Sequence, residues 1–146
     1  MKNIGQVEIK WIIKEWDEIS DTIYEFFGSG GTLILRYIGI GIGRSYAEAI
    51  KRYDATFQER LRTLSEYFAQ RALGNLIFTD VEESDLLGRI IIQETSLKTP
   101  HSRFILYGII AGFLEGIAGK KVSVKEMRNN FPSELEAIFY PKGGES

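Results

Sequence analysis

The chain has 146 residues, 44% of them hydrophobic and 26% charged, and its net charge of −2 gives no general attraction for nucleic acid or anionic membranes. A chain of this length suits one domain that folds without a metal or a disulfide. It has no cysteine and one histidine, His101, which excludes disulfides, thiolate nucleophiles and metal sites built from cysteines or several histidines.

The sequence carries no targeting or membrane-spanning signal that we recognise. Residues 1–14 include Glu8 and lack the small-residue cleavage site of a secretory signal. The most apolar run, residues 104–114, is shorter than the roughly 20 residues that a membrane span needs. We therefore expect a cytoplasmic domain over residues 1–146, with an N-terminal extension at 1–30 and a flexible tail at 142–146.

The first predicted element is an amphipathic helix over residues 7–27, where apolar residues recur at spacings of three, four and seven. Residues 6–13 alone also fit an edge strand, and the spacing does not decide between the two. The glycine-rich residues 28–31 end the element.

Residues 32–53 allow two interpretations. Thr32 to Gly43 followed by Arg44 to Ile50 can form a strand, a glycine loop and a helix. The same residues can form one long helix capped by Thr32, with its glycines along one side.

The remaining elements are easier to assign. We predict a helix over residues 55–73 with Gly74 as its C-terminal cap, and a mostly apolar helix over 103–118 that ends at Gly119. The strands are predicted at 75–81, 88–95, 121–127 and 135–140, with an acidic turn at 82–85 and a connection at 129–133. This order predicts an α+β fold: helices packed on one face of an antiparallel sheet of about four strands.

Two glycine series invite a functional interpretation. Gly39, Gly41 and Gly43 resemble part of a dinucleotide-binding loop, but Arg44 stands where the third glycine of that loop belongs. The alternative is close helix packing, with Gly39, Gly43 and Ala47 at small-residue spacing. Gly108, Gly112 and Gly116 repeat this spacing, which predicts the close approach of another helix, a second subunit or a flat ligand.

Glu115 lies at the edge of the second glycine series and needs a partner if it is buried. Arg36 and Arg44 are the candidates, and the pair is either a structural ion pair or a polar anchor for a ligand. We interpret His101 as a loop or capping residue. No catalytic grouping, metal site or cofactor motif stands out, so the sequence offers no support for an enzyme without excluding one.

The C-terminal half resembles the 4-vinyl reductase domain family. The resemblance rests on the run R-F-I-L-Y-G-I-I-A-G-F-L-E-G-I-A-G over residues 103–119 and on K-V-S-V-K-E over 121–126. The glycine pair at 39 and 43 and the L-G-N at 73–75 also fit, so the resemblance covers residues 31–140. It implies a fold similar to TRAPP transport-complex subunits and haem-NO-binding domains, commonly dimeric, and favours the helical interpretation of residues 32–53.

The chain departs from this family at two positions. The family typically places cysteines after the strand glutamate and before the last strand's phenylalanine. With Glu126 and Phe139 aligned, those positions hold Asn129 and Ala137. A cysteine-based metal or redox role is therefore absent here.

The leading hypothesis is a ligand-binding or sensory module that binds an apolar small molecule or lipid as a homodimer. The alternatives are an adaptor or assembly subunit without a ligand, and an enzyme or accessory protein of tetrapyrrole metabolism. The residues expected to line a pocket or interface belong to the two glycine-bearing segments: Arg36, Gly39, Gly43, Arg44, Tyr107, Gly108, Gly112 and Glu115. The sequence leaves open the ligand, the pathway and the dimer face.

Overall fold

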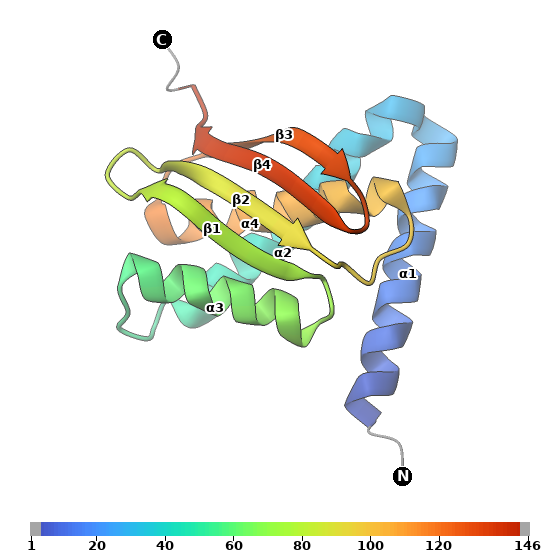
Figure 1. The fold of residues 1–146 in the computed structure, drawn as a ribbon, viewed down its shortest axis with the longest axis horizontal. Helices are drawn as coiled ribbons and strands as arrows, with labels where there is room; N and C mark the ends of the chain where they lie inside the picture. The colour runs from blue at the N-terminus through green and yellow to red at the C-terminus, as the bar shows by residue number, and fades with distance from the viewer. Residues whose placement is uncertain (1–3, 144–146) are drawn as a thin grey trace.

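The computed structural model describes the backbone of residues 4–143 and the side chains of residues 9–143. Residues 144–146 of the expected flexible tail lie outside this range. The chain runs from N-terminal helices into two hairpins separated by a helix (Figure 1). The elements in order are α1 (Ile4–Phe27), η1 (Gly28–Gly30), α2 (Gly31–Ile50), α3 (Phe57–Gln70), β1 (Asn75–Glu82), β2 (Leu87–Gln93), η2 (Pro100–Ser102), α4 (Arg103–Ala118), β3 (Val122–Asn130) and β4 (Glu134–Pro141).

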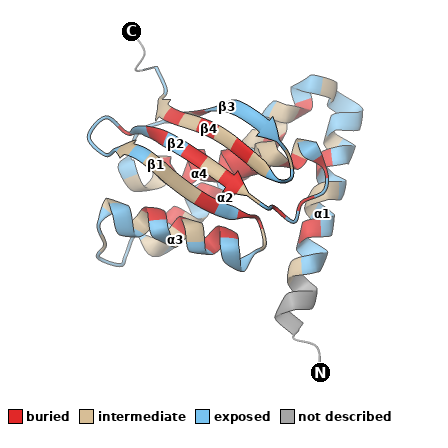
Figure 2. Cartoon of the chain, in the orientation of Figure 1, coloured by how far each residue is buried: buried red, intermediate tan, exposed pale blue. Residues whose placement is uncertain are grey.

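The four strands form one antiparallel sheet in the order β1-β2-β4-β3. Alternate residues of β2 and β4 are buried (Figure 2). Because successive side chains of a strand point to opposite faces, the buried residues form the face that packs on the helices. Along β3 the buried side is Val122 and Val124, and Glu126 follows at the same two-residue spacing. A carboxylate thus ends the inward-facing row of an otherwise apolar strand.

Helix α4 forms the centre of the protein. Every residue from Ile105 to Leu114 is buried, which is the pattern of a helix surrounded by other elements. It contacts β3 on one side, α2 on another and α3 at a further point. The helix begins and ends at the predicted residues, and Gly119 takes the left-handed conformation (φ 74°) that its C-terminal position requires.

Helices α2 and α4 pack so closely that their backbones are in direct contact. A Cβ atom built on Gly43 would overlap the Ile109 carbonyl oxygen and lie 2.7 Å from the Phe113 nitrogen. Gly108 faces Arg36 and Gly39 in the same way. Of the partners that the glycine spacing allowed, the structure shows a helix of the same chain. It confirms the helical interpretation of residues 32–53, although the predicted cap is wrong: α2 begins at Gly31, and the Thr32 hydroxyl donates to the Ser29 carbonyl oxygen instead.

Helix α3 begins with a capping box, in which the Thr56 hydroxyl accepts from the Glu59 N–H and the Glu59 carboxylate accepts from the Thr56 N–H. Its predicted C-terminal cap is wrong. The left-handed residue is Ala72 (φ 58°), and the Leu73 N–H donates to the Phe68 carbonyl oxygen in a Schellman motif. Gly74 lies beyond the cap, with a φ of 131° that leads into β1.

The strand boundaries differ from the prediction by more than one residue in two places. β2 ends at Gln93 rather than residue 95, because Glu94 adopts a left-handed conformation (φ 55°) that an extended strand does not allow. β3 continues to Asn130 through an irregularity between Glu126 and Arg128, which takes residues expected in the connection into the strand. The chain then turns at residues 131–133.

Helix α1 forms a long arm at the side of the sheet (Figure 1). The helix extends over residues 6–13, so the edge-strand alternative is wrong. Its main contacts are with α2, η1 and η2. Over the described residues, no helix has both the length and the apolar character to cross a membrane.

The α2–α4 contact leads to a test within one helix. Gly43→Ala should lower the free energy of unfolding by about 1–3 kcal/mol, because the added methyl group has backbone atoms in its way. Gly41→Ala is the matched control: no atom lies within 4 Å of its added Cβ, and alanine favours a helix over glycine by about 0.8–1 kcal/mol. Urea unfolding measures both, and a stabilised Gly43→Ala would contradict the contact.

Candidate functional site

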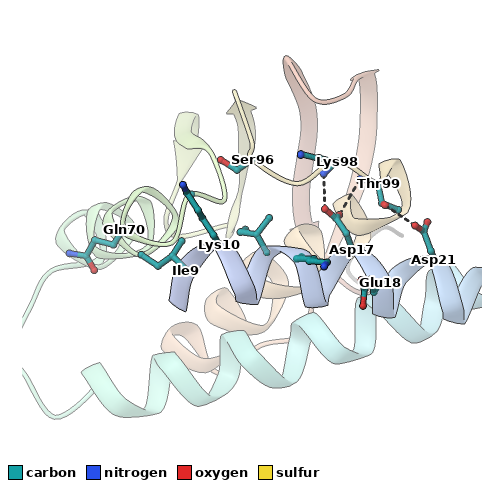
Figure 3. A pocket seen from close by; sticks show the side chains of 12 residues that line it. Ile9, Lys10, Asp17, Glu18, Asp21, Gln70, Ser96, Lys98 and Thr99 are labelled. Atoms are coloured by element: carbon teal, nitrogen blue, oxygen red, sulfur yellow. Dashed lines mark hydrogen bonds between the residues drawn. The ribbon is translucent and has the colours of Figure 1, made fainter. Parts of the chain in front are cut away.

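A groove lies between the α1 arm and the body of the protein (Figure 3). One wall is α1, and the other is formed by the end of α3 and the segment that follows β2. The groove encloses about 1020 Å³, and most of the surface that lines it is apolar. Its described lining residues are Ile9, Lys10, Ile13, Lys14, Asp17, Glu18, Asp21, Gln70, Ala72, Ser96, Lys98 and Thr99.

Asp17 fixes α1 against the segment between β2 and α4. Its carboxylate accepts from the backbone N–H of Lys98 (2.9 Å), the backbone N–H of Thr99 (3.1 Å) and the Ser102 hydroxyl (2.8 Å). One turn further, the Asp21 carboxylate accepts from the Thr99 hydroxyl (Figure 3). These charge-assisted bonds set the position of the groove wall.

An aromatic stack holds α1 at a second point. The rings of Tyr24 and His101 lie 3.7 Å apart between centroids and 9° from parallel. His101 is thus a structural contact within η2, which agrees with its interpretation as a loop residue. No local sequence pattern indicates either contact, because both join residues about 80 positions apart.

A polar cluster lies between α2, α4 and the inward-facing end of β3. The Glu126 carboxylate accepts from the Tyr107 hydroxyl (2.6 Å) and from Arg103 Nε (2.7 Å). Arg36 donates to the Val124 carbonyl oxygen (3.0 Å), and its guanidinium lies over the rings of Phe104 and Tyr107. Burial raises the pKa of Tyr107, and its hydrogen bond to Glu126 raises it further, so the phenol stays neutral.

The predicted site residues fall into three places. Arg36, Tyr107 and Gly108 line a small pocket beside the polar cluster. Arg44 and Glu115 line a polar hollow at the other end of α4, where Arg44 Nη2 and Glu115 Oε1 are 2.6 Å apart. The other three residues, Gly39, Gly43 and Gly112, lie in the contact between α2 and α4.

Glu115 is therefore an ion-paired residue, and of its two candidate partners it is Arg44 that meets it. Its second carboxylate oxygen accepts from the Val122 N–H (3.1 Å), which joins the end of α4 to the start of β3. Sequence reasoning missed Glu126, which accepts from Tyr107, and Arg103, which shares that carboxylate with Tyr107. The two-residue alternation of β3 could have placed Glu126 on the inner face.

No protein-family model matches the sequence, and no curated protein gives a significant match. Solved structures do match the fold. Trafficking protein particle complex subunit 3 from Naegleria fowleri, covalently bound to palmitic acid, superposes with a TM-score of 0.71 at 12% identity, over 94% of this chain and 96% of that one.

Two further matches extend the comparison. The phenol-responsive sensory domain of the transcription activator PoxR, with phenol, has a TM-score of 0.69 at 12% identity, over 86% of this chain and 74% of that one. A vinyl-4-reductase family protein from Methanocaldococcus jannaschii has a TM-score of 0.52 at 17% identity, over 97% and 96%. H-NOX domains also match. The expected α+β fold and its likeness to these proteins are confirmed, and identities this low show the fold alone.

The groove wall can be tested through Asp17. Asp17→Asn should remove about 1–3 kcal/mol of stability, because an amide oxygen cannot replace a carboxylate that accepts three hydrogen bonds. Amide hydrogen exchange at Lys98 and Thr99 should rise as α1 loosens. Glu18→Gln, one residue further on the exposed surface of α1, is the control. Unchanged exchange in Asp17→Asn would show that other contacts hold the arm.

Proposed function

We propose that the chain is a module that binds an apolar small molecule or a lipid in the groove beside α1. The observation that carries this proposal is the groove itself: its volume of about 1020 Å³ and its mainly apolar lining suit a ligand the size of a lipid chain. Ile13, Ile9 and Ala72 supply apolar surface, and Lys10, Lys14 and Lys98 add alkyl stems that can cover a bound chain.

Fold neighbours support the proposal without deciding it. One of them is bound to palmitic acid and another is a phenol-responsive sensory domain. The same architecture therefore accommodates apolar compounds in other proteins. The alternative is an adaptor that binds no ligand. The exposed apolar side chains of α1 favour this role, because such a surface is typical of a site that binds another protein.

The groove can be blocked without disturbing the core. Ser96 is exposed and lines the groove, so Ser96→Trp should place a bulky ring in it and obstruct ligand binding, whereas Ser84→Trp places the same ring in the turn between β1 and β2. Native mass spectrometry of the purified protein should show a bound compound in the wild type and in Ser84→Trp. In Ser96→Trp we expect the affinity for this compound to fall at least about tenfold, seen as a loss of the bound species. A ligand-free wild type would favour the adaptor role, and equal occupancy in both variants would place the ligand outside the groove.

We also propose that the module is a homodimer joined through α1. Two rows of apolar residues follow the seven-residue repeat of a coiled-coil seam. Ile9, Trp16 and Ile23 form the first row, half-buried against the body. Ile12, Ile19 and Phe26 form the second row, with exposures of 45%, 45% and 74%.

A second copy of α1, related by a twofold axis, would cover the exposed row with the same residues from its own surface. This arrangement uses one self-complementary stripe and needs no further partner. The half-buried row already belongs to the body, so the exposed row is the part of the seam left for another helix.

Ile19→Glu tests the dimer, because Ile19 is exposed in the single chain and its replacement should leave the fold intact. We expect the dimer dissociation constant, measured by sedimentation or light scattering, to rise at least about tenfold. Gln58→Glu adds the same charge to an exposed position of α3 and should not change it. A wild type that is monomeric at high concentration would refute the dimer and leave the groove proposal standing.

A further inference from the structure

The small pocket beside Arg36 shares no lining residue with the groove beside α1. It lies between α2, α4 and the edge strand β3 and encloses about 140 Å³. A cavity of about 150 Å³ with apolar walls holds one benzene ring in another protein. Its apolar lining residues are Leu33, Ile40, Ala111, Val122 and Val124, and its remaining ones are Arg36, Tyr37, Tyr107, Gly108, Ser123 and Lys142.

The side chain of Arg36 brings a cation into this apolar space. One N–H group donates to the Val124 carbonyl oxygen, and the guanidinium lies 5.3 Å from the Phe104 ring centroid and 5.5 Å from that of Tyr107. Arg36 has five N–H donors. No nitrogen of Arg36 is among the buried atoms without a partner in the described residues, so its remaining donors open onto the pocket or solvent.

The charges around Arg36 do not balance. The polar cluster contains two guanidinium groups, Arg36 and Arg103, and one carboxylate, Glu126, which is bound to Arg103 and to the neutral Tyr107. The net charge of these groups is therefore +1. Of the described residues that line the pocket, Arg36 and Lys142 are cationic and none is acidic. Burial also lowers the pKa of Arg36, and the neighbouring Arg103 lowers it further.

We infer that this pocket binds a small aromatic or aliphatic molecule that carries one carboxylate. The open N–H groups of Arg36 form a fork that matches the two oxygens of a carboxylate. A single negative charge neutralises the cluster, and the apolar walls accept a ring or short chain of benzene size. Leu33 and Tyr37, which line the pocket, are 55% and 60% exposed, so part of its lining reaches solvent.

Benzoate is the probe, and benzamide is its neutral counterpart of the same shape. Titration of the isotope-labelled protein, followed by NMR, should shift the amide signals of Gly108, Ser123 and Val124. We expect benzoate to bind at least about tenfold more tightly than benzamide. Equal affinity for the two compounds, or no shift of these signals, would overturn the inference. This comparison uses the wild-type protein and does not depend on the folding of a variant.

Two variants assign the binding to Arg36. Arg36→Gln should weaken benzoate binding to the level of benzamide, and Arg36→Lys should retain part of it because the charge remains. Lys125→Gln removes one positive charge from the exposed face of the same strand, β3, and should leave the affinity unchanged. Equal weakening by Lys125→Gln and Arg36→Gln would show general attraction by surface charge and would refute a built site.

Discussion

The arrangement of the protein depends on the backbone contact between α2 and α4. Each glycine removes the side chain that would hold the helices apart, and each costs helix stability that only the resulting contact can offset. Because the two helices touch at Gly39, Gly43, Gly108 and Gly112, no ligand fits between them. Space for a ligand is therefore found beside the pair: in the groove next to α1 and in the pocket next to β3.

The sequence predicted this contact better than it predicted the sites. Glycines at four-residue spacing in two segments indicate two close helices, and the alternation of β3 indicates which of its residues face inward. Periodicity could not decide residues 32–53, since a glycine-rich apolar run fits both a strand and a helix. The groove depends on where α1 lies, and α1 is placed by Asp17 and Tyr24 through partners about 80 residues away. No local pattern records such a pairing.

Helix α1 takes part in two of the proposed binding events, the binding of a ligand in the groove and the formation of the dimer. One side of it forms the groove wall, and the exposed row of its seam faces away from the body. The described hydrogen bonds and the aromatic stack that hold it lie in its C-terminal half, and its N-terminal half is held by apolar packing. A partner helix that orders α1 would therefore also order the groove, and a ligand in the groove would favour the dimer by the same factor, because coupling between two binding events is reciprocal.

Two arginines of α2 show how the same residue type serves different ends. Arg44 lies at the edge of the helix contact and forms an ion pair with Glu115. The Glu115 carboxylate also accepts from the Val122 N–H, which joins α4 to β3. Arg36, eight residues earlier in α2, donates to a backbone carbonyl oxygen and lies over two aromatic rings. The nearby carboxylate of Glu126 is bound to Arg103 instead. A half-buried guanidinium without its own carboxylate costs stability. An anionic ligand that binds beside Arg36 would neutralise its guanidinium and offset this cost. Arg44 is already neutralised by Glu115, so we expect a ligand at Arg36 and not at Arg44.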